Sequence, residues 1–593
     1  MEKHQFDIEF HQTLEKRDKL KKRMNMISIF RFLFMFICLG CLLWGYFGKY
    51  SFLYLFSGIS LVVFLWFVQY HDDLKKQYQY YQAKSDIYQQ HIDRIQYKWS
   101  SFSCDGSQWC DDHNYKVYDL DILGQHSLFQ MINVAFTDQG QKNLAMMLCQ
   151  EPSSYQEVIK HQNAVRDLSQ HKEFMIEVQT YGQILPRHSG KTIDEYIAMQ
   201  NQFQKMPNYI FIVSFLTVMA AIGTLFSIAN PYSRVIFEIG AVSQLCFSLF
   251  YFSKHQRLFE PIQKLEKSLS CFQDIFNLIE KEHFQSEELL AIQAKICRDG
   301  HAVQGISSLS KIASRVNYRQ NIFAYVVLNA LGMFDFIVRN QYVQWSSLYQ
   351  KNMKQWFEGL YQLESYMSLC VLYVDGFNVH MPEISQSQKL VFHQIKHPLI
   401  ENAVGNDFEM EKTVCIITGS NMSGKTTFMR TIGLNLVLAY AGGYVFAESM
   451  ECSLMHMMTS MRVKDNVEEG ISTFYGELLR IKEMITYAQN QAPMICLIDE
   501  IFKGTNSLDR LAGAKATLQK LSLPFMMTFL TTHDVELCYQ IQSDIVNYHF
   551  DEYYQDSHIY FDYQIKKGIS QTTNGQFLLK QLGILEEDDY LSS

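Results

Sequence analysis

A glycine-rich segment, Gly419 to Thr427, constrains the fold of this chain more than any other feature. It reads Gly-Ser-Asn-Met-Ser-Gly-Lys-Thr-Thr, which matches the pattern G-x-x-x-x-G-K-[ST]. The apolar run from Val414 to Ile417 before it predicts a strand, and the segment from Phe428 to Tyr440 after it predicts a helix. A strand, such a loop and a helix in that order predict an α/β domain whose backbone N–H groups at the helix N-terminus face phosphate groups.

The side chains of this loop fit a nucleotide with its metal ion. Lys425 is expected to reach the β- and γ-phosphates, and the Thr426 hydroxyl is expected to coordinate Mg²⁺. The remaining loop residues would wrap the phosphates with their backbone; they are Gly419, Ser420, Asn421, Met422, Ser423, Gly424 and Thr427. The loop therefore predicts ATP and Mg²⁺ as cofactors, and a glycine-containing turn that matches by chance is the alternative.

Two further apolar runs end in polar residues that fit the same site. The run from Met494 to Ile498 is typical of a strand buried on both faces, and Asp499 and Glu500 follow it. Asp499 could hold the Mg²⁺ shell, and Glu500 could orient an attacking water. A second run, Met526 to Leu530, leads to His533, at the end of a strand where α/β sheets bind ligands. Each residue could instead belong to an ordinary polar loop, but their order favours one ATPase site.

In order and in amino-acid sequence, these motifs resemble those of the MutS family of ATPases, which are relatives of the ABC ATPases. The resembling segments are residues 417–427, 439–445, 470–477, 497–506 and 532–537, and His397-Pro398 resembles the entry to the domain. Ser472-Thr473-Phe474 is the most diagnostic, because a generic phosphate-loop protein has no reason to carry it there. The resemblance implies an ABC-like P-loop ATPase domain over residues 396–593.

The resemblance also implies a mechanism. In the MutS family two ATPase domains meet head to tail, with each nucleotide between them, so a homodimer is expected. Ser472 would contact the γ-phosphate bound by the partner chain, Glu500 would polarise the attacking water, and His533 would sense the γ-phosphate. Ser420 and Ser423 stand where the family usually has Pro and Gly. Both are small, and phosphate binding is expected to survive.

Residues 101–395 predict a helical region. Residues 120–168 are similar to the start of the MutS core domain, and Arg257 to Met381 has apolar residues at helical spacing with few breakers. These long helices would match the levers that join the family's core to its ATPase. Their aromatic and methionine side chains are expected to be core rather than a binding site, for example Phe323, Tyr325, Met333 and Phe334.

Four apolar stretches approach the roughly 20 residues that a helix needs to cross a bilayer. Met26 to Trp44 and Phe52 to Val68 form one predicted hairpin. Tyr209 to Ile228 and Val235 to Phe252 form a second, which interrupts the helical region. Tyrosines and tryptophans cluster at the ends of the stretches, as in membrane-interface belts. The sequence thus predicts two transmembrane hairpins, and buried helices of a soluble domain are the alternative.

Basic residues predict the orientation of these hairpins. A basic run from Lys16 to Arg23 precedes the first stretch, Lys75-Lys76 follow the second, and Lys254 and Arg257 follow the fourth. The positive-inside rule places the open ends of both hairpins, and the ATPase domain, in the cytoplasm. We expect a multi-pass protein of a plasma or inner membrane, in contact with the lipid bilayer, with residues 1–100 as its N-terminal segment.

The net charge of −9 gives no global basic footprint for DNA. One hypothesis is a membrane-anchored MutS-family ATPase that lacks the mismatch-reading domain and binds DNA by shape, with DNA binding implied by the resemblance and a role in mismatch repair not favoured. A second hypothesis couples the same ATPase to a membrane or protein partner without DNA. A transporter is least favoured, because only Glu238 stands out as a charged residue that could mark a pathway.

Overall fold

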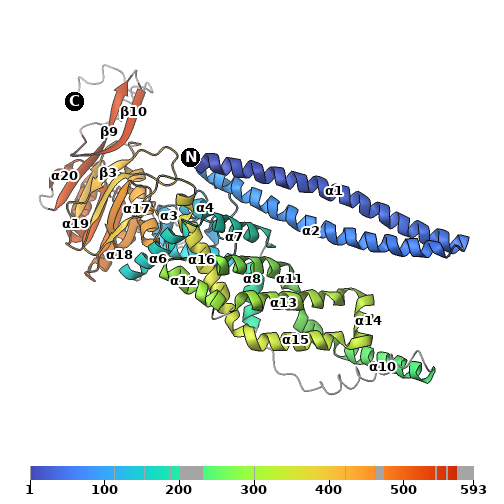
Figure 1. The fold of residues 1–593 in the computed structure, drawn as a ribbon. Helices are drawn as coiled ribbons and strands as arrows, with labels where there is room; N and C mark the ends of the chain where they lie inside the picture. The colour runs from blue at the N-terminus through green and yellow to red at the C-terminus, as the bar shows by residue number, and fades with distance from the viewer. Residues whose placement is uncertain are drawn as a thin grey trace.

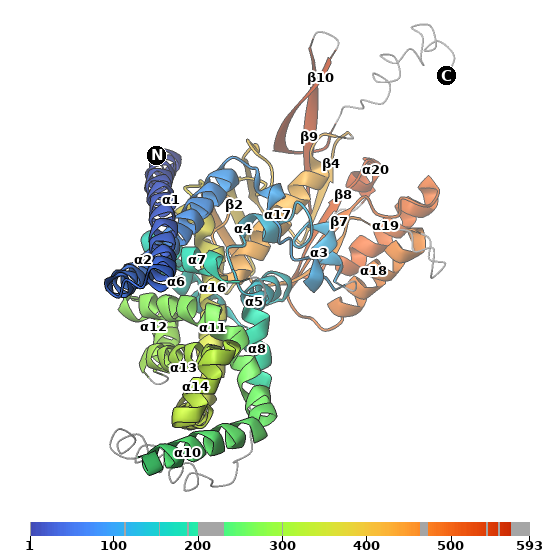
Figure 2. The ribbon, with the colours of Figure 1, turned by 90° about the vertical axis from the view of Figure 1, so that its right-hand side faces the viewer.

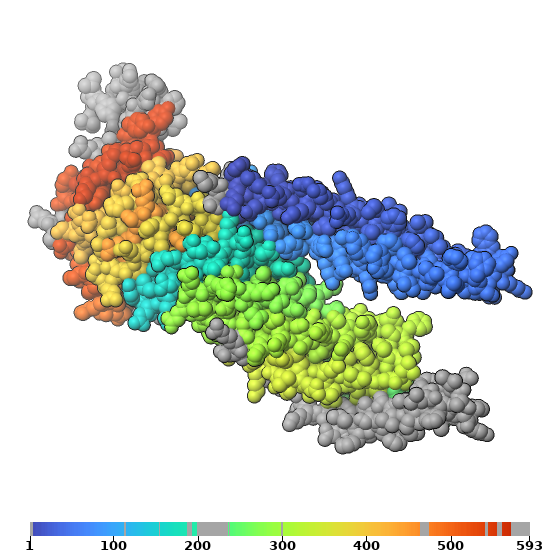
Figure 3. All heavy atoms as spheres, in the orientation of Figure 1, coloured from blue at the N-terminus to red at the C-terminus, as the bar shows by residue number. Residues whose placement is uncertain are grey.

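The structure, a computed structural model, describes residues 2–111, 114–152, 154–186, 189–199, 231–298, 301–420, 422–462, 473–540, 544–555 and 558–570. The protein is mixed α and β, with a long N-terminal hairpin, a helical middle region and a C-terminal α/β domain (Figure 1). The hairpin and the middle region extend in the same direction, away from the α/β domain (Figures 1 and 3).

The hairpin consists of α1 (Glu2–Gly48) and α2 (Phe52–Ile95), which lie side by side along their length. Both helices are long and apolar enough to cross a membrane, and no other unbent helix among the described residues meets the same criterion. The first two predicted stretches lie inside these helices, so the part of that prediction that concerns apolar helices is confirmed. Each helix continues well beyond its apolar stretch. The added turns carry mostly polar residues and extend toward the middle region.

The outer half of this hairpin carries its polar groups on the inside. The hydroxyl of Ser57 donates to the carbonyl oxygen of Cys38 at 3.2 Å, and that of Ser60 donates to the carbonyl oxygen of Phe34 at 2.8 Å. Phenylalanines such as Phe32 and Phe36 are mostly exposed on the outside. This pattern is the reverse of a water-soluble helix, and it suits lipid.

The inner half of α2 is fixed to the middle region by a buried ionic cluster. Asp375, just after α16 (Met353–Val374), accepts from Arg94 at 2.8 Å and lies 2.5 Å from Nδ1 of His91. Arg94 also donates to the carbonyl oxygen of Met131 at 2.7 Å. Burial would raise the pKa of Asp375, but His91 and Arg94 outweigh it and hold that pKa below its usual value.

The middle region is helical through α16, whereas the end of the predicted helical stretch, residues 383–395, contributes β1 (Glu383–Ser385) and β2 (Leu390–Ile395) to the α/β domain. The helices of the middle region begin and end as follows: α3 Tyr115–Asp119, α4 Leu128–Ile132, α5 Asp138–Cys149, α6 Tyr155–Leu168, α7 Lys172–Ile184, α8 Ser189–Met199, α10 Pro231–Phe250, α11 Phe252–Lys281, α12 Glu287–Gln293, α13 Ala302–Asn317, α14 Ile322–Gly332 and α15 Phe334–Tyr349. Helix α16 is buried along most of its length, and its Trp356 and Phe357 lie in the main core with Phe272 of α11.

One sequence prediction for this region is wrong, and another is covered only in part by the described residues. Phe323 was expected in the core, but it is 85% exposed, so that prediction is wrong; Tyr325 and Met333 are buried. The cause is the orientation of α14, which presents its apolar face outward. The third predicted stretch, 209–228, lies outside the described residues, and the fourth, 235–252, coincides with α10 and a break at Tyr251.

The α/β domain contains two sheets. The larger has the strand order β10-β9-β4-β8-β7-β6, in which only the β9–β10 pair is antiparallel, and the smaller has the order β1-β5-β2-β3. The strands are β1 Glu383–Ser385, β2 Leu390–Ile395, β3 Asn406–Glu409, β4 Val414–Thr418, β5 Ser449–Ser453, β6 His456–Ser460, β7 Met494–Asp499, β8 Met526–Thr531, β9 Ile545–Gln555 and β10 His558–Lys567.

Helices cover both faces of the larger sheet (Figure 2). Alternate residues of β4 face opposite layers: Cys415 and Ile417 pack with α17 (Lys425–Ala441), whereas Val414 and Ile416 pack with the other layer. That layer contains α18 Thr473–Ala488, α19 Ser507–Leu521 and α20 Glu536–Gln540. The carboxyl ends of β4, β7 and β8 therefore meet at one edge, next to the start of α17.

Candidate functional site

The loop between β4 and α17 uses backbone conformations that favour glycine. Gly419 and Gly424 have φ angles of +145° and +109°. A Cβ atom at Gly419 would lie 2.9 Å from both the carbonyl oxygen of Phe550 and Oγ of Ser423, so a larger residue would force the loop apart. The loop is thus shaped to bring backbone close to a ligand. Asn421 lies outside the described residues.

Lys425 is folded into this loop rather than extended into solvent. Its side chain donates from Nζ to the carbonyl oxygens of Gly419 at 2.8 Å and Ser420 at 2.7 Å, and the residue is only 5% exposed. Burial lowers the pKa of Lys425 to about 8, although the carboxylates of Glu500 and Asp499 oppose the shift. The loop therefore holds a poorly hydrated cation that an anion would stabilise.

A hydroxyl and a carboxylate meet beside Lys425. The hydroxyl of Thr426 lies 3.0 Å and 2.9 Å from the two carboxylate oxygens of Asp499, and the Thr531 hydroxyl donates to the same carboxylate at 2.5 Å. Asp499 ends β7, Thr531 ends β8 and Thr426 begins α17, so the sheet topology brings the three together. These are the hard oxygen ligands that Mg²⁺ prefers.

Glu500 and His533 form a close pair at the same edge. Nε2 of His533 lies 2.6 Å from Oε1 of Glu500, and Nζ of Lys503 lies 3.2 Å from its other oxygen. The hydrogen bond from His533 is the largest cause that lowers the pKa of Glu500 to about 2, with Lys503 contributing and burial opposing. Glu500 is therefore an ionised acceptor near neutral pH, held in place by two donors.

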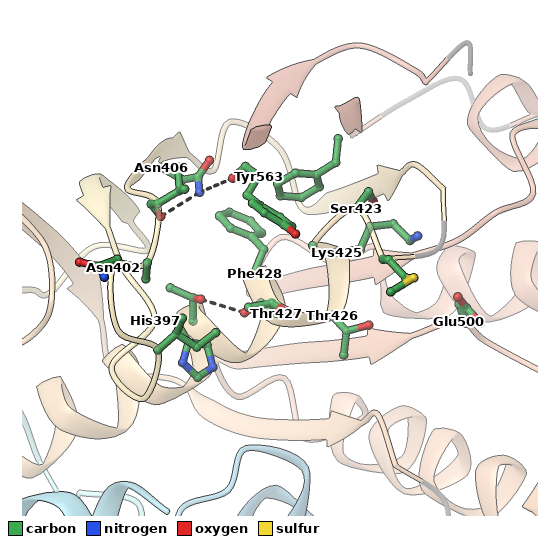
Figure 4. Close-up of a pocket in the computed structure, with 17 residues that line it drawn as sticks. His397, Asn402, Asn406, Ser423, Lys425, Thr426, Thr427, Phe428, Glu500 and Tyr563 are labelled. Atoms are coloured by element: carbon green, nitrogen blue, oxygen red, sulfur yellow. Dashed lines mark hydrogen bonds between the residues drawn. The ribbon is translucent and has the colours of Figure 1, made fainter. Parts of the chain in front are cut away.

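The loop opens on a cavity of about 500 Å³ (Figure 4). Ser423, Lys425, Thr426 and Glu500 line one side of it. The hydroxyl of Ser423 is buried and has no hydrogen-bond partner among the residues that the structure describes. Buried hydroxyls are normally paired, so this one fits a ligand that accepts a hydrogen bond, as a phosphate oxygen does.

The other side of the cavity contains residues to which the sequence analysis gave no role in a site, above all Tyr563. Its ring lies next to the loop, since a Cβ atom at Gly424 would be 3.2 Å from it, and its carbonyl oxygen accepts from Asn406 at 3.0 Å. His397 also lines the cavity, and burial lowers its pKa to about 4, with Arg430 adding to the shift. The His397-Pro398 motif was a usable signal for this wall, whereas Tyr563 lies in β10 without any motif.

The structure brings most of the predicted site residues together, and their roles stay predictions. Gly419, Ser420, Met422, Ser423, Gly424, Lys425, Thr426, Thr427, Asp499, Glu500 and His533 belong to the loop or to the strand ends beside it. The Ser420 hydroxyl is engaged by Glu552 of β9, and Met422 projects into solvent. Ser472 lies outside the described residues.

A second ionic network joins the α/β domain to the middle region. Asp119 of α3 is fully buried and accepts from the Thr459 hydroxyl at 2.7 Å, from the backbone N–H of Arg462 at 3.0 Å and from Nη1 of Arg480 at 3.0 Å. Asp121 pairs with Arg462 at 2.5 Å. Thr459 and Arg462 lie just before the segment 463–472, and Arg480 lies on α18, which follows that segment.

Comparison with known proteins shows similarity to proteins named MutS, MutS2 and MSH3. Residues 415–584 match the family model described as MutS domain V. The chain is 30% identical to "DNA mismatch repair protein MutS" of Aquifex pyrophilus over 216 residues, which are 35% of this chain and 25% of that protein. "Endonuclease MutS2" of Streptococcus sanguinis (strain SK36) is 30% identical over 211 residues, 35% of this chain and 27% of that protein. "DNA mismatch repair protein MSH3" of Candida glabrata is 29% identical over 265 residues, which are 41% of this chain and 25% of that protein.

The fold and the site define a mixed α and β protein, with a C-terminal α/β domain and two N-terminal helices that could cross a membrane. The α/β domain is similar to MutS domain V, and about a third of the chain is similar to proteins named MutS and MutS2. The chain matches about a quarter of the length of these curated relatives.

Proposed function

We propose that this protein is a membrane-anchored ATPase that binds and hydrolyses ATP with Mg²⁺ in its C-terminal domain. The observation that carries the proposal is the position of Lys425, whose buried ammonium is enclosed by the carbonyls of Gly419 and Ser420 beside the Thr426–Asp499 pair. The site combines a buried cation, a glycine-containing loop and hard oxygen ligands. Together they fit a nucleoside triphosphate with its metal ion.

Each side of the cavity would hold a different part of ATP. The loop backbone, Lys425 and the Ser423 hydroxyl would bind phosphate oxygens, and Thr426 with Asp499 would hold Mg²⁺, which would neutralise phosphate charge. The ring of Tyr563 supplies an apolar face for the base. Glu500, ionised and fixed by His533 and Lys503, would accept a hydrogen bond from the attacking water and orient it.

ATP would also control the association of two copies. By the MutS resemblance, two C-terminal domains close head to tail, and Ser472 of one copy contacts the γ-phosphate held by the other. The γ-phosphate adds charge that both copies can contact, so it favours the closed homodimer, and hydrolysis releases it. In this proposal the chain divides into an anchoring segment (1–100), a helical core and lever region (101–395) and the ATPase domain (396–593), with β1 and β2 of the α/β domain just before the last boundary.

The ATP-driven closure of the dimer could act on either of two kinds of partner. The relatives are named for DNA mismatch repair and for an endonuclease, which supports DNA as a ligand. A specific feature supports the alternative, in which ATP-driven motion acts on a membrane or protein partner: α14, near the far end of the middle region, exposes apolar rather than basic residues. Phosphate contacts need Lys and Arg, so this surface is poorly suited to DNA.

ATP turnover by the full-length protein in lipid nanodiscs tests the proposal. It should be measured without DNA and with homoduplex, mismatched and branched DNA, each at two salt concentrations, with Lys425→Ala as the inactive control. Stimulation by DNA that weakens with salt would favour the DNA-binding function. Turnover indifferent to every DNA would favour the membrane or protein partner. Turnover equal in the wild type and in Lys425→Ala would refute the ATPase site.

A further inference from the structure

Helix α14 (Ile322–Gly332) exposes apolar side chains and buries polar ones. Its exposed face consists of Ile322, Phe323, Val326, Val327 and Leu331, and Phe323 is 85% exposed. Its buried face carries Tyr325 and Asn329 instead. A helix on a water-soluble domain does the opposite, with its apolar stripe on the core and its polar residues in water.

The polar groups behind α14 are engaged with one another. The backbone N–H of Asp335 donates to the side-chain oxygen of Asn329 at 3.0 Å. The Asp335 carboxylate is fully buried and lies 3.2 Å from Nε of Arg319 and 3.6 Å from Nδ1 of His255. Charged groups that pair in the interior behind an apolar exterior are typical of protein segments surrounded by lipid.

The neighbouring helix α10 repeats the arrangement. Gln244 and Ser248 are fully buried, whereas Val242, Leu249 and Phe250 are exposed. Helices α10 and α14 are packed together, with Phe252 at the start of α11 against Tyr325 at a ring distance of 5.6 Å. Together they form an apolar end of the middle region, on the same side of the molecule as the outer half of the α1–α2 hairpin (Figure 1).

The border of this apolar end carries the residues that favour a membrane interface. Lys254 and Arg257 are exposed in the first two turns of α11, and Arg315 and Tyr318 are exposed at the end of α13 and just after it, shortly before α14 in the chain. Basic side chains attract anionic headgroups, and tyrosine prefers the headgroup level. The guanidinium of Arg319 stacks over Phe252 at 4.9 Å, which places this border next to the start of α11.

We infer that the exposed face of α14 contacts the hydrocarbon of the bilayer and forms a membrane contact of this protein in addition to the predicted hairpins. With its 11 residues α14 is only about 16 Å long, about half of the hydrocarbon thickness, so it enters the membrane without crossing it. The chain turns by 82° between α14 and the helices that follow, at Met333 with its φ of +46°, and returns toward the α/β domain. The inference rests on the proposed anchoring through α1 and α2.

A second copy of the chain is the other occupant to consider for such a face. Lipid fits better for two reasons. The inverted pattern continues on α10 and on the α1–α2 hairpin, which is too extensive for one pairwise contact. The basic and aromatic border is also complementary to headgroups rather than to an identical copy, since like charges would oppose each other across a two-fold axis.

Photo-cross-linking of the full-length protein in nanodiscs tests this contact. A photoreactive amino acid replaces one exposed residue at a time in the presence of a phospholipid that carries a detectable tag. Position 323 reports on α14, and position 36 on α1 reports on the anchor. Position 508 on α19, where Leu508 is 80% exposed, is the matched control in the α/β domain.

We expect the lipid adduct at position 323 to be within about twofold of that at position 36, and at least about tenfold above that at position 508. Adducts at position 36 but not at 323 would overturn the inference and leave the anchoring intact. A cross-link at 323 to a second copy, without lipid, would overturn it in favour of a dimer contact. Adducts at neither position would refute the anchoring as well.

Discussion

Nucleotide affinity should depend on pH because of Lys425. Its ammonium form is the one that attracts phosphate, and burial lowers its pKa to about 8. A bound phosphate would raise that pKa again, so binding above pH 8 requires the uptake of a proton. Affinity is therefore constant below the pKa and falls as pH rises through it. At about pH 9 only about one tenth of the protein carries the charge, which predicts an affinity loss of about tenfold, or about 1.4 kcal/mol.

The dissociation constant of a fluorescent ATP analogue, measured from about pH 7 to about pH 9, checks this value. The experiment is done with a chelator, because bound Mg²⁺ would add its own charge beside Lys425. Lys425→Arg is the matched control, since a guanidinium stays charged over this range. Its affinity can be weaker, but it should not vary with pH. A flat profile for the wild-type protein, or an equal slope in Lys425→Arg, would refute the reasoning.

Three further predictions concern single side chains. Glu500→Gln should bind ATP with nearly unchanged affinity but lower turnover by about 10²-fold or more, and a normal rate would show that Glu500 does not orient the water. Tyr563→Ala should weaken ATP binding by about 1–3 kcal/mol, whereas Tyr563→Phe and Tyr560→Ala on the same hairpin should not; equal losses in all three would remove the base-contact role. Asp119→Asn should lower the midpoint of thermal unfolding of the α/β domain, because it leaves Arg480 with a weakened buried partner, at a cost of about 1–3 kcal/mol. Asp121→Asn, at a more exposed site, should lower it less, and the reverse order would contradict the network described for Asp119.

The strands that form the candidate site could be predicted from the sequence almost to the residue. The apolar runs at Val414, Met494 and Met526 became β4, β7 and β8 because strands buried on both faces leave an uninterrupted apolar signature. The loop motif then located Lys425 and Thr426, and chain order placed Asp499, Glu500 and His533 at the same edge.

The two sites that the sequence did not reveal depend on tertiary placement. Tyr563 reaches the loop from a β-hairpin more than a hundred residues later in the chain, and no local pattern encodes that approach. Phe323 was misplaced because an apolar stripe at helical spacing looks the same whether it faces a core or lipid. Only the position of Asn329 and Asp335 behind the helix distinguishes the two cases.

The ionic cluster of His91, Arg94 and Asp375 gives the N-terminal hairpin a mechanical property. Helix α2 runs unbroken for 44 residues, about 66 Å, from this cluster to the tip of the hairpin. A tilt of about 5° at its base would displace the tip by about 6 Å. If the hairpin is anchored in a bilayer as proposed, the bilayer would resist such sideways displacement. Angular motion of the cluster at the end of α16 would then either bend the hairpin or move the α/β domain relative to the membrane plane.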